Sequence, residues 1–386
     1  MTLGLYLHIP FCRSRCPYCN FISLEDPDAR TRERFFRDLR LEISRVRQRS
    51  GAFRFDTIYL GGGTPSVLDP AEVAGLLETI RTDFDVAPGA EITCEWNPGD
   101  REEKKLSILK GAGVNRISLG AQSFHDGLLS RLGRRHSSAD ILKTFEGLRA
   151  AGIGNISLDL MLRIPGQTFE DFQHSLERCV KLGAEQVSLY DLEVHPGTQF
   201  GRLRSRGELA LPGEAEHALM YQAAGKVLEW AGYEHYEISN FAKPGFASRH
   251  NLIYWRNQEY LGLGPGAFSY REGVRSQFAK DIPRYLEKCE AGDWRNDEED
   301  VLSEAEKETE TFAMGLRLKA GITPGDFPAI YPALAPRIGV LTEEGLLEQK
   351  DGKVRLTARG QFLSEDIFGF LLNQEERTLP GRPRDV

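Results

Sequence analysis

The chain has 386 residues, of which 40% are hydrophobic and 27% charged, and its net charge is -8. This composition is that of an ordinary globular protein, long enough for one large domain and a smaller one. It has no apolar run of the roughly 20 residues that a membrane-spanning helix needs, and its negative charge argues against sequence-independent nucleic-acid binding.

Short apolar runs alternate with amphipathic stretches up to about residue 240, which predicts βαβ units around a parallel sheet. The expected strands are Leu3–Ile9, Thr57–Leu60, Glu91–Glu95, Arg116–Leu119, Asn155–Leu162 and Gln186–Leu192. The expected helices are Glu33–Val46, Ala71–Phe84, Arg101–Gly111, Ala139–Ala150, Phe169–Leu182 and Gly213–Ala231. Six such units predict an α/β fold, a partial (β/α)6 barrel with its chemistry at the carboxyl ends of the strands.

The first strand leads directly into three of the six cysteines of the chain, Cys12, Cys16 and Cys19. Thiolates held this close on one loop are the ligand set of an iron–sulfur cluster. Three thiolates on a four-iron cluster leave one iron open, so the spacing also predicts a second, exchangeable ligand. The start of the first strand near Met1 leads us to expect no targeting segment, and free thiols favour the cytoplasm.

Other uses of the cysteine triplet fit less well. A disulfide pair is disfavoured because cysteines are few and no signal peptide is apparent. A structural zinc site would need a fourth Cys or His at knuckle spacing, and the remaining cysteines stand singly at Cys94, Cys179 and Cys289. Chance clustering of buried thiols is the remaining alternative.

Polar or glycine-rich motifs follow the next strands. Gly61–Gly63, after the second strand, allows close approach of the backbone to a ligand but lacks the Lys of a phosphate loop. Glu95, Gln122 and Asp159 place polar groups on the next three strands. Each alone is more often a satisfied core group, but their recurrence predicts a shared polar ligand site.

The rhythm breaks over residues 233–300, where His250 lies close to Tyr254 and Trp255. Such a histidine can bind haem iron, but from spacing alone a hydrogen-bonded histidine in an aromatic core is the better interpretation. We expect residues 1–240 to form the barrel, 241–300 an extended connection, 301–372 a mainly helical, winged-helix-like module, and 373–386 a disordered tail. That module could bind DNA, but the acidic charge favours a lid or docking role.

The cysteine spacing, with Tyr18 inside it and the Gly61–Pro65 motif, resembles the radical S-adenosylmethionine superfamily. The stretches Tyr6–Phe21, Glu95–Pro98, Gly113–Phe124 and Asp159–Gln167 resemble its oxygen-independent coproporphyrinogen oxidase group. The resemblance implies that S-adenosylmethionine occupies the open iron of a [4Fe-4S] cluster.

Two departures separate the chain from the true oxidases, which have an N-terminal extension and a further cysteine two positions after the third. Here that position is Phe21, and Cys12 follows only eleven residues. Leu192–Phe200, Tyr236–Phe246 and His250–Trp255 are instead similar to the HemW family of haem chaperones. Members of that family often have a histidine where this chain has Phe268.

The resemblance implies roles for individual residues. Cys12, Cys16 and Cys19 would bind the cluster, and His250 would contribute to haem binding. The residues that would line the S-adenosylmethionine site are Tyr6, Tyr18, Gly62, Gly63, Thr64, Glu95, Gln122, Arg134 and Asp159. Glycine amides would meet the amino-acid end of the cofactor, carboxylates its amine or ribose, and Arg134 its carboxylate.

The function implied is a haem chaperone that binds haem and transfers it to an unidentified acceptor protein. The rival is a radical enzyme acting on a tetrapyrrole, by coproporphyrinogen dehydrogenation, methyl transfer or haem cleavage. A DNA-binding regulator acting through the C-terminal module is the third class.

Overall fold

A computed structural model of the protein describes residues 3–50, 53–99 and 103–372. Its strands are β1 (Gly4–Ile9), β2 (Phe11–Cys12), β3 (Leu24–Glu25), β4 (Arg54–Gly62), β5 (Asp85–Trp96), β6 (Arg116–Gln122), β7 (Asn155–Leu162), β8 (Gln186–Asp191), β9 (Glu234–Glu237), β10 (Asn240–Ala242), β11 (Tyr260–Leu263), β12 (Phe268–Arg271), β13 (Val274–Gln277), β14 (Glu298–Val301), β15 (Leu347–Lys350) and β16 (Lys353–Leu356). The expected tail, 373–386, lies outside the described residues.

The α-helices are α1 (Ala29–Ser50), α2 (Pro70–Asp83), α3 (Glu103–Gly111), α4 (Asp126–Arg131), α5 (Ser138–Ala150), α6 (Phe169–Leu182), α7 (Gln199–Ser205), α8 (Glu214–Trp230), α9 (Arg249–Trp255), α10 (Ile282–Ala291), α11 (Glu304–Arg317), α12 (Tyr331–Glu343), α13 (Ala358–Phe362) and α14 (Ser364–Leu372). Local sequence explains where several of them begin. At α5, for example, the Ser137 side chain accepts from the Asp140 amide while the Asp140 side chain accepts from the Ser137 amide. Equivalent capping boxes start α2, α6 and α11.

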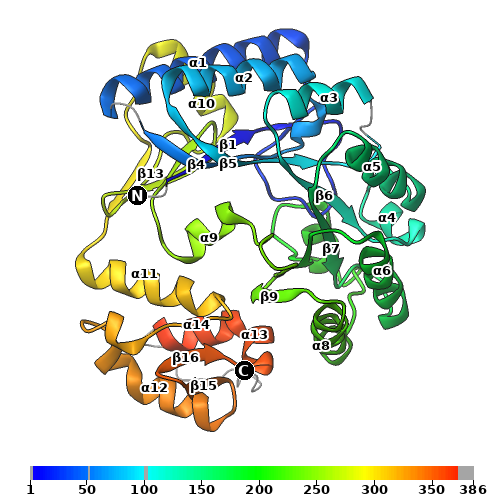
Figure 1. Ribbon diagram of the computed structural model, residues 1–386, viewed down its shortest axis with the longest axis vertical. Helices are drawn as coiled ribbons and strands as arrows, with labels where there is room; N and C mark the ends of the chain where they lie inside the picture. Colours follow the sequence, from blue (N-terminus) through cyan, green and yellow to red (C-terminus); the bar gives the residue numbers. More distant parts are fainter. Residues whose placement is uncertain (1–2, 51–52, 100–102, 373–386) are drawn as a thin grey trace.

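One large curved sheet organises the fold. Its strand order is β14-β13-β12-β11-β1-β4-β5-β6-β7-β8-β10-β9, and the run from β11 to β8 is parallel. The six predicted strands form β1 and β4 to β8, which confirms the parallel sheet. Every residue of the central strand β6 is buried, as expected for a strand covered on both faces. Figure 1 shows α1, α2, α3, α5, α6 and α8 around the outside of the sheet.

The segment 241–300 contributes to the sheet as well as connecting it to the C-terminal module. Its strand β11 pairs in parallel with β1, and β12, β13 and β14 continue from that edge in antiparallel order. The helix α9 precedes β11 and is fixed by Glu91 of β5, whose carboxylate accepts from the backbone amides of Arg249 and His250 at 3.0 Å each. This ion-to-amide contact places the start of α9 against the barrel strands.

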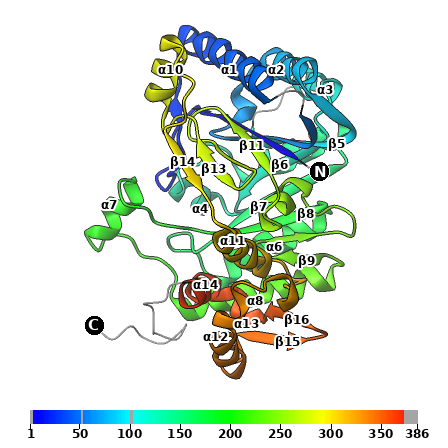
Figure 2. The same ribbon diagram turned by 90° about the vertical axis from the view of Figure 1, so that its left-hand side faces the viewer.

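The C-terminal residues form a module with its own hydrophobic cluster. Phe312, Ile338, Leu341 and Ile367 are its most buried members, and the β15–β16 hairpin covers one side. An isolated bridge between Glu237 and Leu318 joins this module to the sheet. Figures 1 and 2 place it at one end of the molecule, below the barrel. Within the described residues, no helix is both long and apolar enough to cross a membrane.

Candidate functional site

A cavity of about 580 Å³ opens at the carboxyl ends of the parallel strands, beside the cysteine loop. Of the predicted site residues, only Tyr6 and His250 are not part of its lining. The others line it: Cys12, Cys16, Cys19, Tyr18, Gly62, Gly63, Thr64, Glu95, Gln122, Arg134 and Asp159. These residues come from the loop after β1, from β4, β5, β6 and β7 or the turns that follow them, and, for Arg134, from the loop after α4. Parallel strands deliver their carboxyl ends to one edge of the sheet, which brings these distant residues together.

The glycine turn after β4 packs directly on the cysteine loop. The amide of Gly63 donates to the Ile9 carbonyl at 2.8 Å, and the amide of Thr64 donates to the Phe11 carbonyl at 2.7 Å. A Cβ atom on Gly63 would lie 2.7 Å from the Phe11 oxygen, so only glycine permits this approach. The turn therefore fixes the position of Cys12.

A chain of side-chain hydrogen bonds starts and ends on the cysteine loop. Cys12 Sγ lies 3.5 Å from Thr64 Oγ1, and Asn97 Nδ2 donates to the same hydroxyl at 3.2 Å. Arg134 then donates to Asn97 Oδ1 at 3.0 Å and to the Tyr18 hydroxyl at 2.6 Å. Both ends of the loop are thus held by groups from three neighbouring elements.

The three thiols border one cavity rather than converging on one point. In the described part of the chain, no three ligand side chains are close enough to hold a single metal ion. Thiolates of an iron–sulfur cluster bind separate irons, so they need only surround a shared space. Burial raises the pKa of the Cys12 and Cys19 thiols, and cluster binding would therefore release protons.

Two of the carboxylates that line the cavity, those of Glu95 and Asp159, are partly buried. Glu95 accepts from the Tyr59 hydroxyl at 3.0 Å and from the Gly62 amide at 3.2 Å, and Asp159 accepts from the Ser118 hydroxyl at 2.7 Å. Burial, with a smaller repulsion from Asp159, raises the pKa of Glu95 from 4.5 to about 7. Burial also raises the pKa of Asp159. A cation bound between them would stabilise both charges.

Several buried polar atoms of the lining residues have no hydrogen-bond partner among the described residues. Gln122 is 7% exposed, and its Oε1 atom has no hydrogen-bond partner among the described residues. Its backbone adopts a φ of 62°, which is unusual for a residue other than glycine. The Arg134 Nε atom is also buried without a partner. Unpaired buried groups are costly, so this lining fits a polar ligand that carries both charge signs, as S-adenosylmethionine does.

The two remaining predicted residues lie behind the cavity wall. Tyr6 hydrogen-bonds His8 Nδ1 at 3.2 Å and contacts the Tyr59 ring. His250 is 1% exposed, with Nδ1 bonded to Thr57 at 2.7 Å and Nε2 to the Tyr254 hydroxyl at 2.9 Å. Burial, assisted by the charge of Arg116, lowers the pKa of His250 to about 3. In this conformation neither ring nitrogen is free for iron.

Several lining residues were not predicted. Asn97 joins the hydrogen-bond chain, Tyr59 holds Glu95, and the end of β8 supplies Tyr190, Asp191, Glu193 and His195. The sequence signal was available, since the polar run follows a predicted strand just as Glu95 does. Polar groups at strand ends mark the site. Applying this rule to the sixth predicted strand as well identifies the residues at the end of β8.

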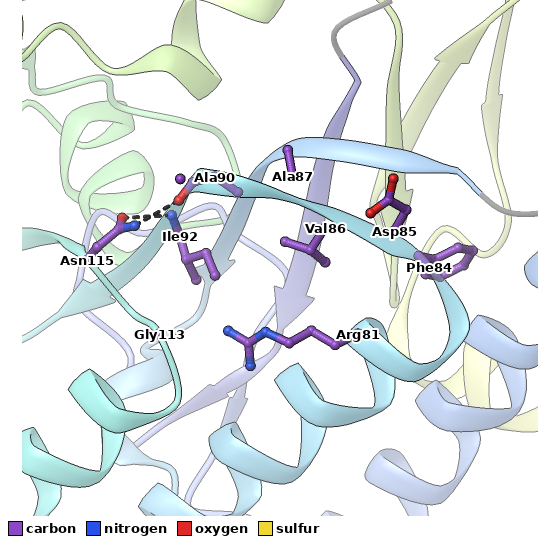
Figure 3. A pocket seen from close by; sticks show the side chains of 10 residues that line it. Arg81, Phe84, Asp85, Val86, Ala87, Ala90, Ile92, Gly113 and Asn115 are labelled. Atoms are coloured by element: carbon purple, nitrogen blue, oxygen red, sulfur yellow. Dashed lines mark hydrogen bonds between the residues drawn. The ribbon is translucent and has the colours of Figure 1, made fainter.

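A second hollow of about 540 Å³ lies at the opposite end of β5, near Arg81 and Asn115. The Asn115 amide bonds to the backbone of Ala90 and Ile92, as Figure 3 shows. Arg81 donates to the Ala112 carbonyl. None of the predicted site residues lines this hollow.

Comparison with known proteins gives matches over nearly the whole chain. The radical SAM superfamily profile matches residues 6–179, and that of the HemN C-terminal domain matches residues 302–363. The heme chaperone HemW of Bacillus subtilis is 37% identical, covering 96% of this chain and 99% of that protein. A mitochondrial radical S-adenosyl methionine domain-containing protein 1 of Danio rerio is 34% identical over 96% of this chain and 84% of its own length.

The coproporphyrinogen III oxidase HemN from Escherichia coli has a similar structure. It superimposes with a TM-score of 0.83 over 96% of this chain and 90% of that one, at 22% identity. This likeness confirms the fold class, a mixed α/β barrel with a helical C-terminal region.

Replacing Gly63 with alanine should reduce cluster content. The added Cβ would collide with the backbone of Phe11, which cannot move without breaking the Thr64 amide bond. We expect a loss of stability of about 1–3 kcal/mol and less iron and sulfide per chain after anaerobic reconstitution. The control is Gly75→Ala on α2, where the nearest atom to the added Cβ is 3.8 Å away. Equal iron content in the two variants would contradict the packing argument.

Replacing Glu95 with glutamine should stabilise the cluster-free protein at high pH. Because the folded-state pKa is raised, the contribution of Glu95 to stability is complete below 4.5 and is lost as the pH rises through about 7. The free energy of unfolding of Glu95→Gln, relative to that of wild type, should therefore be about 1–3 kcal/mol higher at pH 8 than at pH 5. Melting temperatures at the two pH values measure this, with the exposed Glu229→Gln as control. A pH-independent difference for Glu95→Gln would refute the prediction.

Proposed function

The chain belongs to the HemW family of the radical S-adenosylmethionine superfamily, and we propose that it binds haem and transfers it to an acceptor protein. A [4Fe-4S] cluster and S-adenosylmethionine would occupy the cavity at the strand ends. The family assignment follows from relatives such as the Bacillus subtilis heme chaperone HemW, which matches over nearly the whole of both chains. The name of that relative is what suggests haem as the cargo.

The observation that carries the cofactor part of the proposal is the lining of the cavity. It combines three thiols, four carboxylates, two guanidiniums and the unpaired Gln122 oxygen in one space. Cys12, Cys16 and Cys19 would hold three irons, and the fourth iron would accept the amino and carboxylate groups of S-adenosylmethionine. When bound, the reduced cluster supplies one-electron chemistry.

The residues of the chain would orient the cofactor in a defined way. Arg134 carries a buried positive charge near the cysteine loop and suits a carboxylate. Glu95 and Asp159, on strands β5 and β7 of the lining, suit the cationic groups and the ribose hydroxyls. The backbone amides of the glycine turn would meet the amino-acid end, as proposed for Gly62 and Gly63.

The role of His250 in haem binding remains a prediction. Its ring stacks on Tyr59 with the centroids 5.1 Å apart, and both of its nitrogens have partners. Ligation by His250 would require it to release Thr57 or Tyr254.

The six cysteines are all free, which suits a reducing compartment such as the cytoplasm.

The position of Phe21 favours a carrier over an oxidase. A further cysteine two positions after the third would stand at this residue, and here the side chain is a phenylalanine that is 66% exposed. The wall of the cavity also offers apolar area at that point, which suits a large flat ligand.

Haem titration tests the proposal directly. We expect saturable haem binding by the purified protein and transfer to apomyoglobin, used as a probe acceptor, followed by the change in Soret absorption. Anaerobic incubation with dithionite, S-adenosylmethionine and coproporphyrinogen III should give no protoporphyrinogen. Formation of protoporphyrinogen would establish the rival enzymatic activity and contradict the carrier role.

A further inference from the structure

One histidine faces the cavity that contains the cysteines. Of the eight histidines, all of which lie in the described part of the chain, only His195 belongs to the cavity lining. Its side chain is 38% exposed. We propose that His195 supplies a nitrogen ligand to the iron of haem bound at the rim of this cavity. This inference rests on the proposed haem-carrier function and identifies the site of its cargo.

The surroundings of the imidazole suit an iron ligand. Nε2 lies 3.1 Å from a carboxylate oxygen of Glu193, and no described residue hydrogen-bonds to Nδ1. A carboxylate on one ring nitrogen fixes the ring and makes the other nitrogen a better donor. Because Glu193 is 75% exposed, this pair also exchanges readily with solvent. A ligating nitrogen is therefore available without disturbing the core.

The backbone of His195 is held by hydrogen bonds, while its side chain is partly exposed and contacts Glu193. The Thr198 hydroxyl donates to the His195 carbonyl at 2.8 Å and accepts from the Gly201 amide at 2.9 Å, at the start of α7. A Cβ atom on Gly201 would come within 2.2 Å of the same carbonyl oxygen. A fixed backbone lowers the entropy that a ligand must overcome to order the ring.

The cavity wall near the cysteine loop and β8 can cover a macrocycle. Phe21 and Tyr190 line the same cavity as His195, with 66% and 41% of their areas exposed, and Met161 and Leu192 add apolar surface. Large exposed apolar side chains that border one hollow are typical of a binding surface. A porphyrin has a large, flat apolar face that such a surface can contact.

A cation is available for the carboxylates of the haem. Arg15, in the cysteine loop, lines the cavity and donates to the Phe21 carbonyl at 3.4 Å, but it forms no ion pair with a described residue. Guanidinium groups bind carboxylates strongly. Ligand, apolar wall and cation thus occur in one lining.

The other histidines are less suited to this role. His217 is 6% exposed and bonds Asp191 at 2.6 Å, with its ring packed on Phe362. His250 is buried behind Tyr59. His174 is exposed on α6, outside the cavity lining, which makes it a control.

The test compares absorption and magnetic circular dichroism spectra of haem bound to the full chain in matched variants. We expect wild type and His174→Ala to show the same nitrogen-ligated spectrum. His195→Ala should lose that spectrum and bind haem at least about tenfold more weakly, and Glu193→Gln should weaken binding by up to about tenfold. Added imidazole should restore the spectrum of His195→Ala. His195→Gln, closer in size, repeats the test if the alanine variant folds poorly.

The outcomes separate the inference from the proposed function. Haem binding by His195→Ala and His195→Gln with wild-type spectrum and affinity would overturn the role of His195 but leave the carrier function intact. Loss of the nitrogen ligand in His250→Phe alone would assign the iron to His250 instead. Absence of saturable haem binding by wild type would overturn both proposals.

Discussion

The hydrogen-bond chain from Cys12 through Thr64, Asn97 and Arg134 to Tyr18 is the constraint on which the site depends. The cysteine loop has little regular structure of its own beyond the short β2–β3 pair. Its geometry is therefore set from outside, by groups at the ends of β4 and β5 and by Arg134 after α4. These groups lie together only because the parallel sheet aligns its carboxyl edge.

Charge balance in the cavity follows from the same arrangement. Burial desolvates Glu95 and Asp159 and raises the pKa of each carboxyl group. Arg134 remains charged because Tyr18 and the nearby thiols offset its burial. A ligand with an ammonium or sulfonium group and a carboxylate would pair with the Glu95 and Asp159 carboxylates and with Arg134 at the same time. The charges of the lining therefore complement those of such a ligand.

The sequence predicted the parts of the fold that depend on local pattern. Period and spacing located six of the seven parallel strands, and the cysteine triplet marked the site, because a thiolate cluster needs its ligands close together in the chain. The strand β11 was not predicted, since its place beside β1 depends on a contact about 250 residues away in sequence. The burial of His250 among aromatic rings agrees with the interpretation drawn from spacing alone, but its partners Thr57 and Glu91 lie far away in sequence and no local motif reveals them. Asn97 and His195 were not predicted, because the rule that polar residues at strand ends mark the site was not applied to every strand.

The central claim is that three thiolates leave one iron of the cluster open for S-adenosylmethionine. Electron paramagnetic resonance of the reconstituted, dithionite-reduced protein tests this most directly, with spectra recorded before and after addition of S-adenosylmethionine. The account predicts a [4Fe-4S] signal whose g values shift when the cofactor is added, because its amino and carboxylate groups then bind the open iron. A cluster signal that is identical with and without the cofactor would contradict the claim.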